Sequence, residues 1–343
     1  MTRSANDQQH VDEALAANAA QVSLLVELER RAQDVASGFL RRLIRNSFRT
    51  LVNQYVIQFG SLDAAPDPLR IEPLIADFTA DLEDLRGYDP VSALRPFVEE
   101  ARDRGVVWGQ RAAPSAPLRP FDVQPSPEVE RILYEIPDNV SAVIDQTQRL
   151  AQAVPVTSWS DVAALVGKAG QAAASVDRSA ATAVSTALND AVDQVARAHG
   201  ARVLWVAEPN ACVVCLALSG RLADPATGQW FDEEATFGRP GSAPAVWPPG
   251  EPLQRPPRHP HCRCVCQTWW GDVRGDSTFD LPAALRREAR RSVLLGRSLP
   301  TESHAVRIDA ADRLLRQGAE LPVSVQARAR RAVQTGRFSH RTR

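Results

Sequence analysis

The chain has 343 residues, of which 44% are hydrophobic and 24% charged, and its formal net charge at pH 7 is −1. This length allows two or three domains with sizeable cores. No run of about 18 or more apolar residues occurs, which excludes a typical transmembrane helix, and the N-terminus lacks the apolar stretch of a secretory signal. We therefore expect synthesis in a reducing cytoplasm, where clustered cysteines indicate metal or redox chemistry rather than disulfides.

The N-terminal third of the chain carries helical signals and no chemical motif. Apolar residues recur at three- and four-residue steps, which is typical of amphipathic helices. Helices are predicted over about 11–59, 71–86 and 90–110. Gly60 is a fitting end for the first, while Asp89 and Pro90 supply an N-cap and a first-turn proline for the third. Residues 1–112 are therefore assigned to a helical N-terminal domain.

Two long central helices follow a proline-rich stretch at 113–127, which is expected to be a semi-rigid linker. They are predicted over 127–153, with an interruption at Pro137, and over 159–198. Ser158 and Asp161 are spaced like a capping box at the start of the second helix, and Gly200 follows its end. The apolar stripe of this helix is rich in alanine, which would let another helix or subunit approach closely.

Short β-structure is predicted beyond the central helices. The run 202–207 is β-type and leads into a group of cysteines, and 220–231 resembles a hairpin. Residues 264–270 predict a closing strand, which we expect to pair with the strand at 202–207. Residues 238–260 are rich in proline and predict an irregular loop.

The C-terminal region is basic. Helices are predicted over about 281–295, 305–317 and 322–335. From Asp280 to Arg343 the chain has 14 arginines and six acidic residues, a local net charge of +8. One interpretation is contact with DNA or another acidic partner, because arginine neutralises phosphates and releases counterions. The other is a set of amphipathic helices whose arginines face water.

All five cysteines gather in one stretch, between Cys212 and Cys266. Its opening Cys212-Val-Val-Cys215 and its closing His259-Pro-His-Cys262 supply thiolate and imidazole, the ligands that Zn²⁺ prefers. Together these four side chains fill a tetrahedron. We interpret the site as structural, because a catalytic zinc keeps one position open for water.

Two further thiols leave the ligand set open. Cys264 follows at strand spacing and can replace Cys262 as a ligand, whereas Cys266 is expected to pack nearby. The alternative to a metal site is a set of small buried cysteines. A thiol oxidoreductase would place its C-x-x-C at a helix N-terminus without Cys or His partners, so the partners here disfavour it. A metal-dependent nuclease would need an activating His and a further Asn or His on a helix after the cluster, and the stretch 267–272 that follows Cys266 contains neither residue type.

At these residues the sequence resembles a known family, the Mu-F-type minor head (head morphogenesis) proteins of tailed bacteriophages. That family combines a tryptophan-led strand, a C-x-x-C, a following glycine and a closing P-P-x-H-x-x-C-R-[CS] motif. The matching positions here are Trp205, Cys212, Cys215, Gly220, Pro256, Pro257, His259, Cys262, Arg263 and Cys264. Because the family often has serine at the last position, the resemblance makes Cys262 the better ligand and Cys264 the alternate one. It covers at most residues 128–272.

The resemblance implies a structural minor capsid protein that acts at or near the portal during procapsid assembly and DNA packaging. Its partners would be the portal protein and the scaffold or major capsid protein, with packaged DNA a further candidate for the arginine-rich C-terminus. It would lie in the virion, in the head interior or at the portal vertex, after assembly in the host cytoplasm. The competing interpretation is a capsid maturation protease encoded beside the portal gene. That enzyme would need a Ser/His or Cys/His constellation, and the cysteines are already used by the predicted metal.

The sequence thus predicts a mostly α protein with a small α+β zinc-knuckle module. Short strands surround the Cys/His cluster, and a bound structural zinc would offset the ordering cost of a module with few apolar runs. Four regions are predicted: an N-terminal helical domain over 1–112, a linker over 113–127, the Mu-F-like module over 128–272 and a basic helical extension over 273–343.

Overall fold

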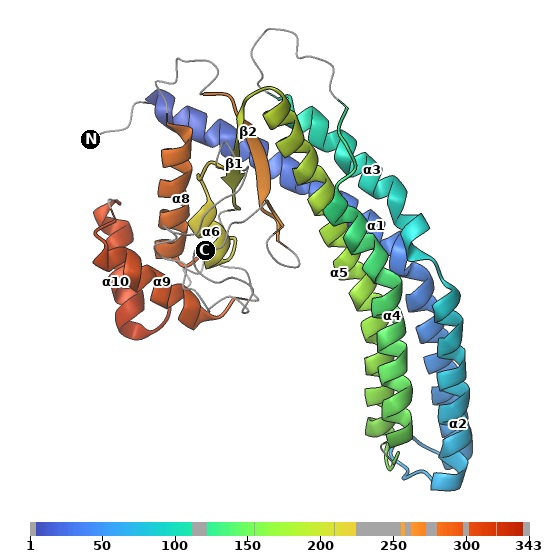
Figure 1. The fold of residues 1–343 in the computed structure, drawn as a ribbon. Coiled ribbons are helices and arrows are strands. Elements are labelled where there is room, and N and C mark those ends of the chain that lie inside the picture. The colour runs from blue at the N-terminus through green and yellow to red at the C-terminus, as the bar shows by residue number, and fades with distance from the viewer. Residues whose placement is uncertain are drawn as a thin grey trace. The chain divides into compact units, whose positions relative to one another are not determined.

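The computed structural model describes residues 5–111, 122–153, 155–208, 210–223, 255–257, 262–271, 280–297, 302–319 and 321–338. Within these residues the protein is mostly helical with one two-stranded antiparallel sheet (Figure 1), as the predicted class requires. The helices are α1 (Ala5–Phe59), α2 (Pro68–Asp81), the 3-10 helix η1 (Leu82–Gly87), α3 (Pro90–Gly109), α4 (Pro127–Ala153), α5 (Trp159–Ala198), α6 (Val213–Leu218), α8 (Leu281–Leu295), α9 (His304–Arg316) and α10 (Val323–Thr335). The strands are β1 (Arg202–Val206) and β2 (Val265–Trp269). None of the described helices is both long and apolar enough to cross a membrane.

The predicted helices are confirmed, and α4, α5 and α8 have the bounds expected from the sequence. The start of α5 shows why. The backbone amide and the hydroxyl of Ser158 both donate to the Asp161 carboxylate, at 2.9 and 3.0 Å. The end of α5 is followed by Gly200 in the left-handed region, with φ of +67°, as expected for a glycine after a helix.

Three local predictions differ from the structure. The helix expected over 71–86 is α2 followed by η1, and α4 continues through Pro137 without the expected interruption. Ile136 and Val140 are buried on either side of that proline, so packing of the apolar face outweighs one lost backbone hydrogen bond. The short helix α6, which contains the second cysteine of the C-x-x-C, was not predicted.

The chain divides into two compact units by its contacts. Unit 1 comprises Met1–Val26, Ala101–Gln124 and Ser185–Arg343, and unit 2 comprises Glu27–Glu100 and Pro125–Val184. The units alternate along the chain because α1, α3 and α5 each contribute to both. The predicted region boundaries stay predictions, since the linker and the 272/273 boundary lie largely outside the described residues.

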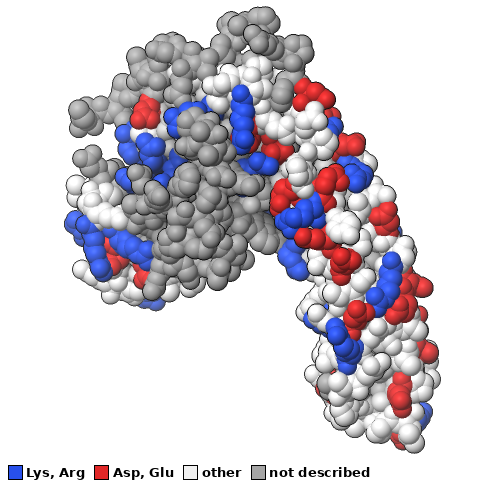
Figure 2. Space-filling view, viewed as in Figure 1, with Lys and Arg blue, Asp and Glu red and all other residues white. Residues whose placement is uncertain are grey.

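Unit 2 is built from helices alone. Leu40 and Leu51 of α1, Ile75 of α2 and Ile144 of α4 are buried in it. Tyr55 stands edge-on to Trp159 at the start of α5, with ring centroids 5.0 Å apart. Acidic and basic side chains are mixed along its surface (Figure 2), which is the pattern of a solvated helical bundle.

Unit 1 contains the sheet and the C-terminal helices. β1 pairs with β2 as predicted, and the register places Trp205 opposite Cys266 and Val206 opposite Val265. α8 packs against α6, while α9 and α10 pack against α8. The cysteine stretch and these helices share one buried core, in which Trp205, Leu218, Val293 and Leu314 take part. The described part of the predicted 220–231 hairpin contributes a single bridge, between Leu204 and Leu222.

The alanine-rich stripe of α5 permits the close helix approach expected from the sequence. In unit 1, Gly105 of α3 lies directly against α5. A Cβ added at Gly105 would contact the Leu188 carbonyl oxygen and would lie 2.7 Å from the Ala191 Cβ. One turn later, a Cβ at Gly109 would lie 2.9 Å from the Val195 Cβ. Glycines on α3 thus match small residues on α5, so the two backbones pack at short range.

Candidate metal centre

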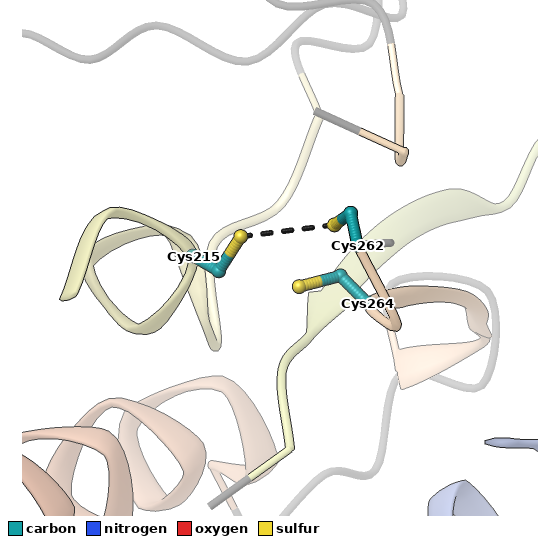
Figure 3. Close-up of side chains that lie close together, drawn as sticks. All are labelled: Cys215, Cys262 and Cys264. Carbon is teal, nitrogen blue, oxygen red and sulfur yellow. Dashed lines mark hydrogen bonds between the residues drawn. The ribbon is translucent and has the colours of Figure 1, made fainter. Parts of the chain in front are cut away.

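The candidate site lies where α6 meets the segment that enters β2. Cys212 is the N-cap of α6 and Cys215 lies in its first turn. Cys262 and Cys264 precede Val265, the first residue of β2. Figure 3 shows the side chains of Cys215, Cys262 and Cys264 pointing toward one another from these two segments. The pairing of β1 with β2 therefore brings the two halves of the motif together, as the sequence predicts.

The three sulfur atoms have the spacing of a metal-thiolate group. The Sγ atoms of Cys215, Cys262 and Cys264 lie within 4.8 Å of one another, and all three residues are buried. The Cys215 and Cys262 sulfurs are 3.7 Å apart. Zn–S bonds of about 2.3 Å in tetrahedral geometry separate sulfurs by about 3.8 Å, so the Cys215–Cys262 separation is compatible with a metal ion bound by both sulfurs. The same separation is far longer than a disulfide bond of about 2.0 Å, and all five cysteines are free.

The structure only partly overlaps the predicted ligand set. It brings together Cys215 and Cys262 with the predicted alternate ligand Cys264. Cys212 is half-buried and lies outside this three-residue group, with its sulfur accepting a hydrogen bond from the Cys215 amide at 3.5 Å. His259 lies outside the described residues. The roles of Cys212 and His259 as ligands stay predictions.

Burial and mutual hydrogen bonding disfavour deprotonation of the thiols in this group. Hydrogen bonds with the thiols of Cys212, Cys262 and Cys264, together with burial, raise the pKa of the Cys215 thiol well above its usual value. Burial also raises the pKa of Cys264. A nucleophilic or redox cysteine needs a lowered pKa. The C-x-x-C does start a helix, and a divalent metal bound there would offset the cost of burying thiolates.

Cys266 is separate from this group, as the sequence suggests. It is buried in β2, and burial raises the pKa of its thiol. Its backbone amide donates to the Asn189 side chain of α5 at 2.7 Å, and its carbonyl accepts from Gln21 of α1 at 3.2 Å. These two anchors of β2 were not predicted. The one available signal was a polar Asn189 within the apolar stripe of α5.

The motif tryptophan and glycine are built into the same core. Trp205 is fully buried, and its backbone carbonyl accepts from the Gly220 amide at 2.8 Å. Gly220 has φ of +77°, a left-handed conformation that favours glycine. A Cβ there would meet the backbone of α8 at Pro282 and lie 2.7 Å from the Arg286 amide nitrogen. The glycine is therefore required both by its conformation and by the close approach of α8.

A buried ion cluster holds the segment before the closing motif. Arg255 contacts Asp190 at 2.6 Å and Asp193 at 3.4 Å, and both carboxylates lie on α5 and are buried. Asp193 is also paired with Arg197 at 2.7 Å. Burial raises the pKa of Asp193, although the two arginines act in the opposite direction. This cluster was not predicted, because it joins residues 62 positions apart.

Comparisons with family models, curated proteins and solved structures found no match to this chain. The residues themselves therefore carry the functional argument. The described arrangement offers three convergent buried thiols that can hold a metal ion.

Proposed function

We propose that this chain is a structural minor head protein of a tailed bacteriophage, acting at or near the portal during procapsid assembly and DNA packaging. The observation that carries the proposal is the compact arrangement of the compound motif. Trp205, Gly220 and the cysteines on both sides of the loop belong to one buried core. A chance scatter of the same residues would not be expected to pack around one point.

In this proposal the cysteine group holds a structural zinc ion. Cys215, Cys262 and Cys264 supply three thiolates, and Cys212 or His259 supplies the fourth ligand. The metal would cross-link the N-terminus of α6 to the segment that enters β2. Two paired strands are marginally stable alone, so metal-binding free energy would contribute directly to folding of this module.

The proposed partners are the portal protein and the scaffold or major capsid protein, and the proposed location is the phage head or portal vertex. Packaged DNA is a further proposed partner. Arg286, Arg287 and Arg290 of α8 line a pocket of about 580 Å³ together with the α9–α10 connection. Figure 2 shows basic side chains gathered over α8 to α10. The Arg286 guanidinium donates to the Gly220 carbonyl oxygen at 2.7 Å, and those of Arg287 and Arg290 would suit phosphate oxygens.

Co-assembly tests the head-protein proposal. The chain would be co-expressed with portal, scaffold and major capsid proteins of the phage that encodes it, and procapsids would be purified. We expect incorporation in few copies per particle, lost when the portal is omitted, and capsid proteins of unchanged mass. Specific cleavage of scaffold or capsid protein by the purified chain would instead support the maturation protease. Procapsids that form normally and exclude the chain would contradict a head role.

The salt dependence of DNA binding tests the arginine groove. The matched variants are Arg287→Gln with Arg290→Gln in the groove, and Arg131→Gln, whose side chain is exposed and paired with acidic residues in unit 2. The DNA association constant K falls as salt rises, and each lost phosphate contact makes this fall less steep. In the groove variant only, the plot of log K against log salt should become shallower by about 1 per arginine. No binding by the wild type at low salt, or equal losses in both variants, would remove DNA from the proposed partners.

A further inference from the structure

A buried ion pair lies beside the cysteine group, and the zinc motif does not include it. Glu302 precedes Ser303, the N-cap of α9, and Arg307 lies in the first turn of this helix. The Arg307 side chain is 1% exposed and that of Glu302 is 9% exposed. The Arg307 Nε donates to the Glu302 carboxylate at 2.7 Å. These two charges come from the C-terminal helical region, far from the C-x-x-C in the chain.

The pair binds the backbone on both sides of Cys212. The Arg307 Nη2 donates to the Ala211 carbonyl oxygen at 2.8 Å. The Val213 amide, which directly follows Cys212, donates to Glu302 Oε1 at 2.7 Å. Charge-assisted hydrogen bonds are roughly twice as strong as neutral ones. The ion pair therefore fixes the backbone of Cys212 and the first residue of α6, which in turn sets the position of Cys215.

A contribution to folding stability does not by itself explain why Glu302 and Arg307 are buried. Burying two charges carries a large desolvation cost, and apolar residues of similar volume often replace such pairs without loss of stability. The Arg307 Nη1 adds to the cost, because it is buried and has no hydrogen-bond partner among the described residues. A role in positioning a charged group accounts for the pair better. The pair holds the backbone on both sides of Cys212, at the start of the helix that carries Cys215.

We propose that Glu302 and Arg307 are positioning residues of the metal centre and that they couple metal binding to the docking of α9. The inference rests on the zinc site of the proposed function, although neither residue is a ligand. Coupling of this kind is reciprocal. Docked α9 would raise the affinity of the cysteine group for zinc, and bound zinc would stabilise α9 against the rest of unit 1.

Zinc affinity of the full chain, measured by competition with a chelating dye, tests the first half of the inference. Glu302→Gln removes the negative charge and keeps an acceptor, and Arg307→Lys keeps the positive charge but loses the two-pronged geometry. Loss of supporting residues around a metal typically costs about 10- to 100-fold in affinity, which is the expected effect of each variant. Two controls lie on the same helix. Arg316→Met removes an exposed pair with Asp312, and Leu314→Val perturbs the core.

Hydrogen exchange of α9 with and without zinc tests the second half. Zinc should slow exchange of the 304–316 amides in the wild type and in both controls, and this protection should shrink in Glu302→Gln. Leu314→Val separates positioning from general stability, since it should weaken α9 without changing zinc affinity to the same degree. Zinc binding with equal affinity in all variants would overturn the inference and leave the zinc site intact. A folded wild type that binds no zinc would overturn both.

Discussion

Cys215 and Cys262 are 47 positions apart in the chain, and their sulfur atoms lie 3.7 Å apart within the buried core of unit 1. This relationship gives the C-x-x-C and the closing motif one common role. Each half alone is a pair of small residues near a short element. Together with Cys264 they form a donor set that matches the size of a tetrahedral metal-thiolate site.

Metal removal is expected to destabilise unit 1 selectively. A chelator should raise the hydrogen-exchange rates of amides in β1, β2 and α6, because metal-binding free energy is folding free energy for a module with few strands. Amides of α2 and α4 in unit 2 serve as the internal control and should keep their rates. Equal loss of protection in both units, or no change in either, would contradict a local structural metal.

Substitution of single cysteines should separate ligands from neighbours. Cys264→Ser is expected to lower zinc affinity more than Cys212→Ser, since the Cys264 sulfur belongs to the close group and the Cys212 sulfur does not. Cys266→Ala should leave zinc affinity unchanged, because this thiol packs apart from the group. Competition with a chelating dye measures all three. A larger loss in Cys212→Ser than in Cys264→Ser would favour the ligand set predicted from the cysteine and histidine spacing.

Gly105→Ala should destabilise unit 1 by about 1–3 kcal/mol, the usual cost of forcing an extra carbon into a packed interface. The new Cβ would lie 2.7 Å from the Ala191 Cβ. Gly167→Ala is the matched control, since a Cβ there meets nothing within 4 Å, and an alanine in a helix gains about 0.5–1 kcal/mol over glycine. Urea unfolding at neutral pH measures both. Equal effects of the two variants would show that α3 and α5 do not pack closely.

Asp161 should make the stability of the chain depend on pH. Hydrogen bonds from the Thr157 backbone amide and the Ser158 hydroxyl hold the pKa of Asp161 below its usual value. A carboxyl with a lowered folded-state pKa stabilises the fold above its unfolded pKa of about 3.9, and this contribution is lost as the pH falls through the folded-state pKa. Asp161→Asn should therefore lower the unfolding free energy at neutral pH and converge with the wild type in acid. Asp138→Asn, on the exposed side of α4, is the control; a difference that stays constant with pH would contradict the assignment.

The helices could be predicted well because capping residues and apolar periodicity are encoded within or next to each helix. Ser158 with Asp161 and Gly200 mark both ends of α5, and these signals lie within a few residues of the helix itself. The helix α6 was missed because it has only six residues, begins with two β-branched valines and contains half of a metal motif. Its six residues are all buried, and it packs against α8 and α9, so tertiary packing outweighs the local preference of the valines.

The candidate site could be predicted only in outline. Cysteine spacing located the cluster, but the choice between Cys212 and Cys264 depends on where α6 begins and how β2 enters the core. Asn189, Arg255 and Arg307 were missed for a similar reason. Each acts through a contact with a residue more than 60 positions away, and no local pattern encodes such a contact.

The most direct test of the central claim is elemental analysis of the wild-type chain purified without chelator, alongside Cys215→Ser and Cys266→Ala. The account predicts about one zinc per chain in the wild type and in Cys266→Ala, since one tetrahedral site needs a single ion. Cys215→Ser should lose the metal. A wild-type chain that is fully folded and free of metal would contradict the account.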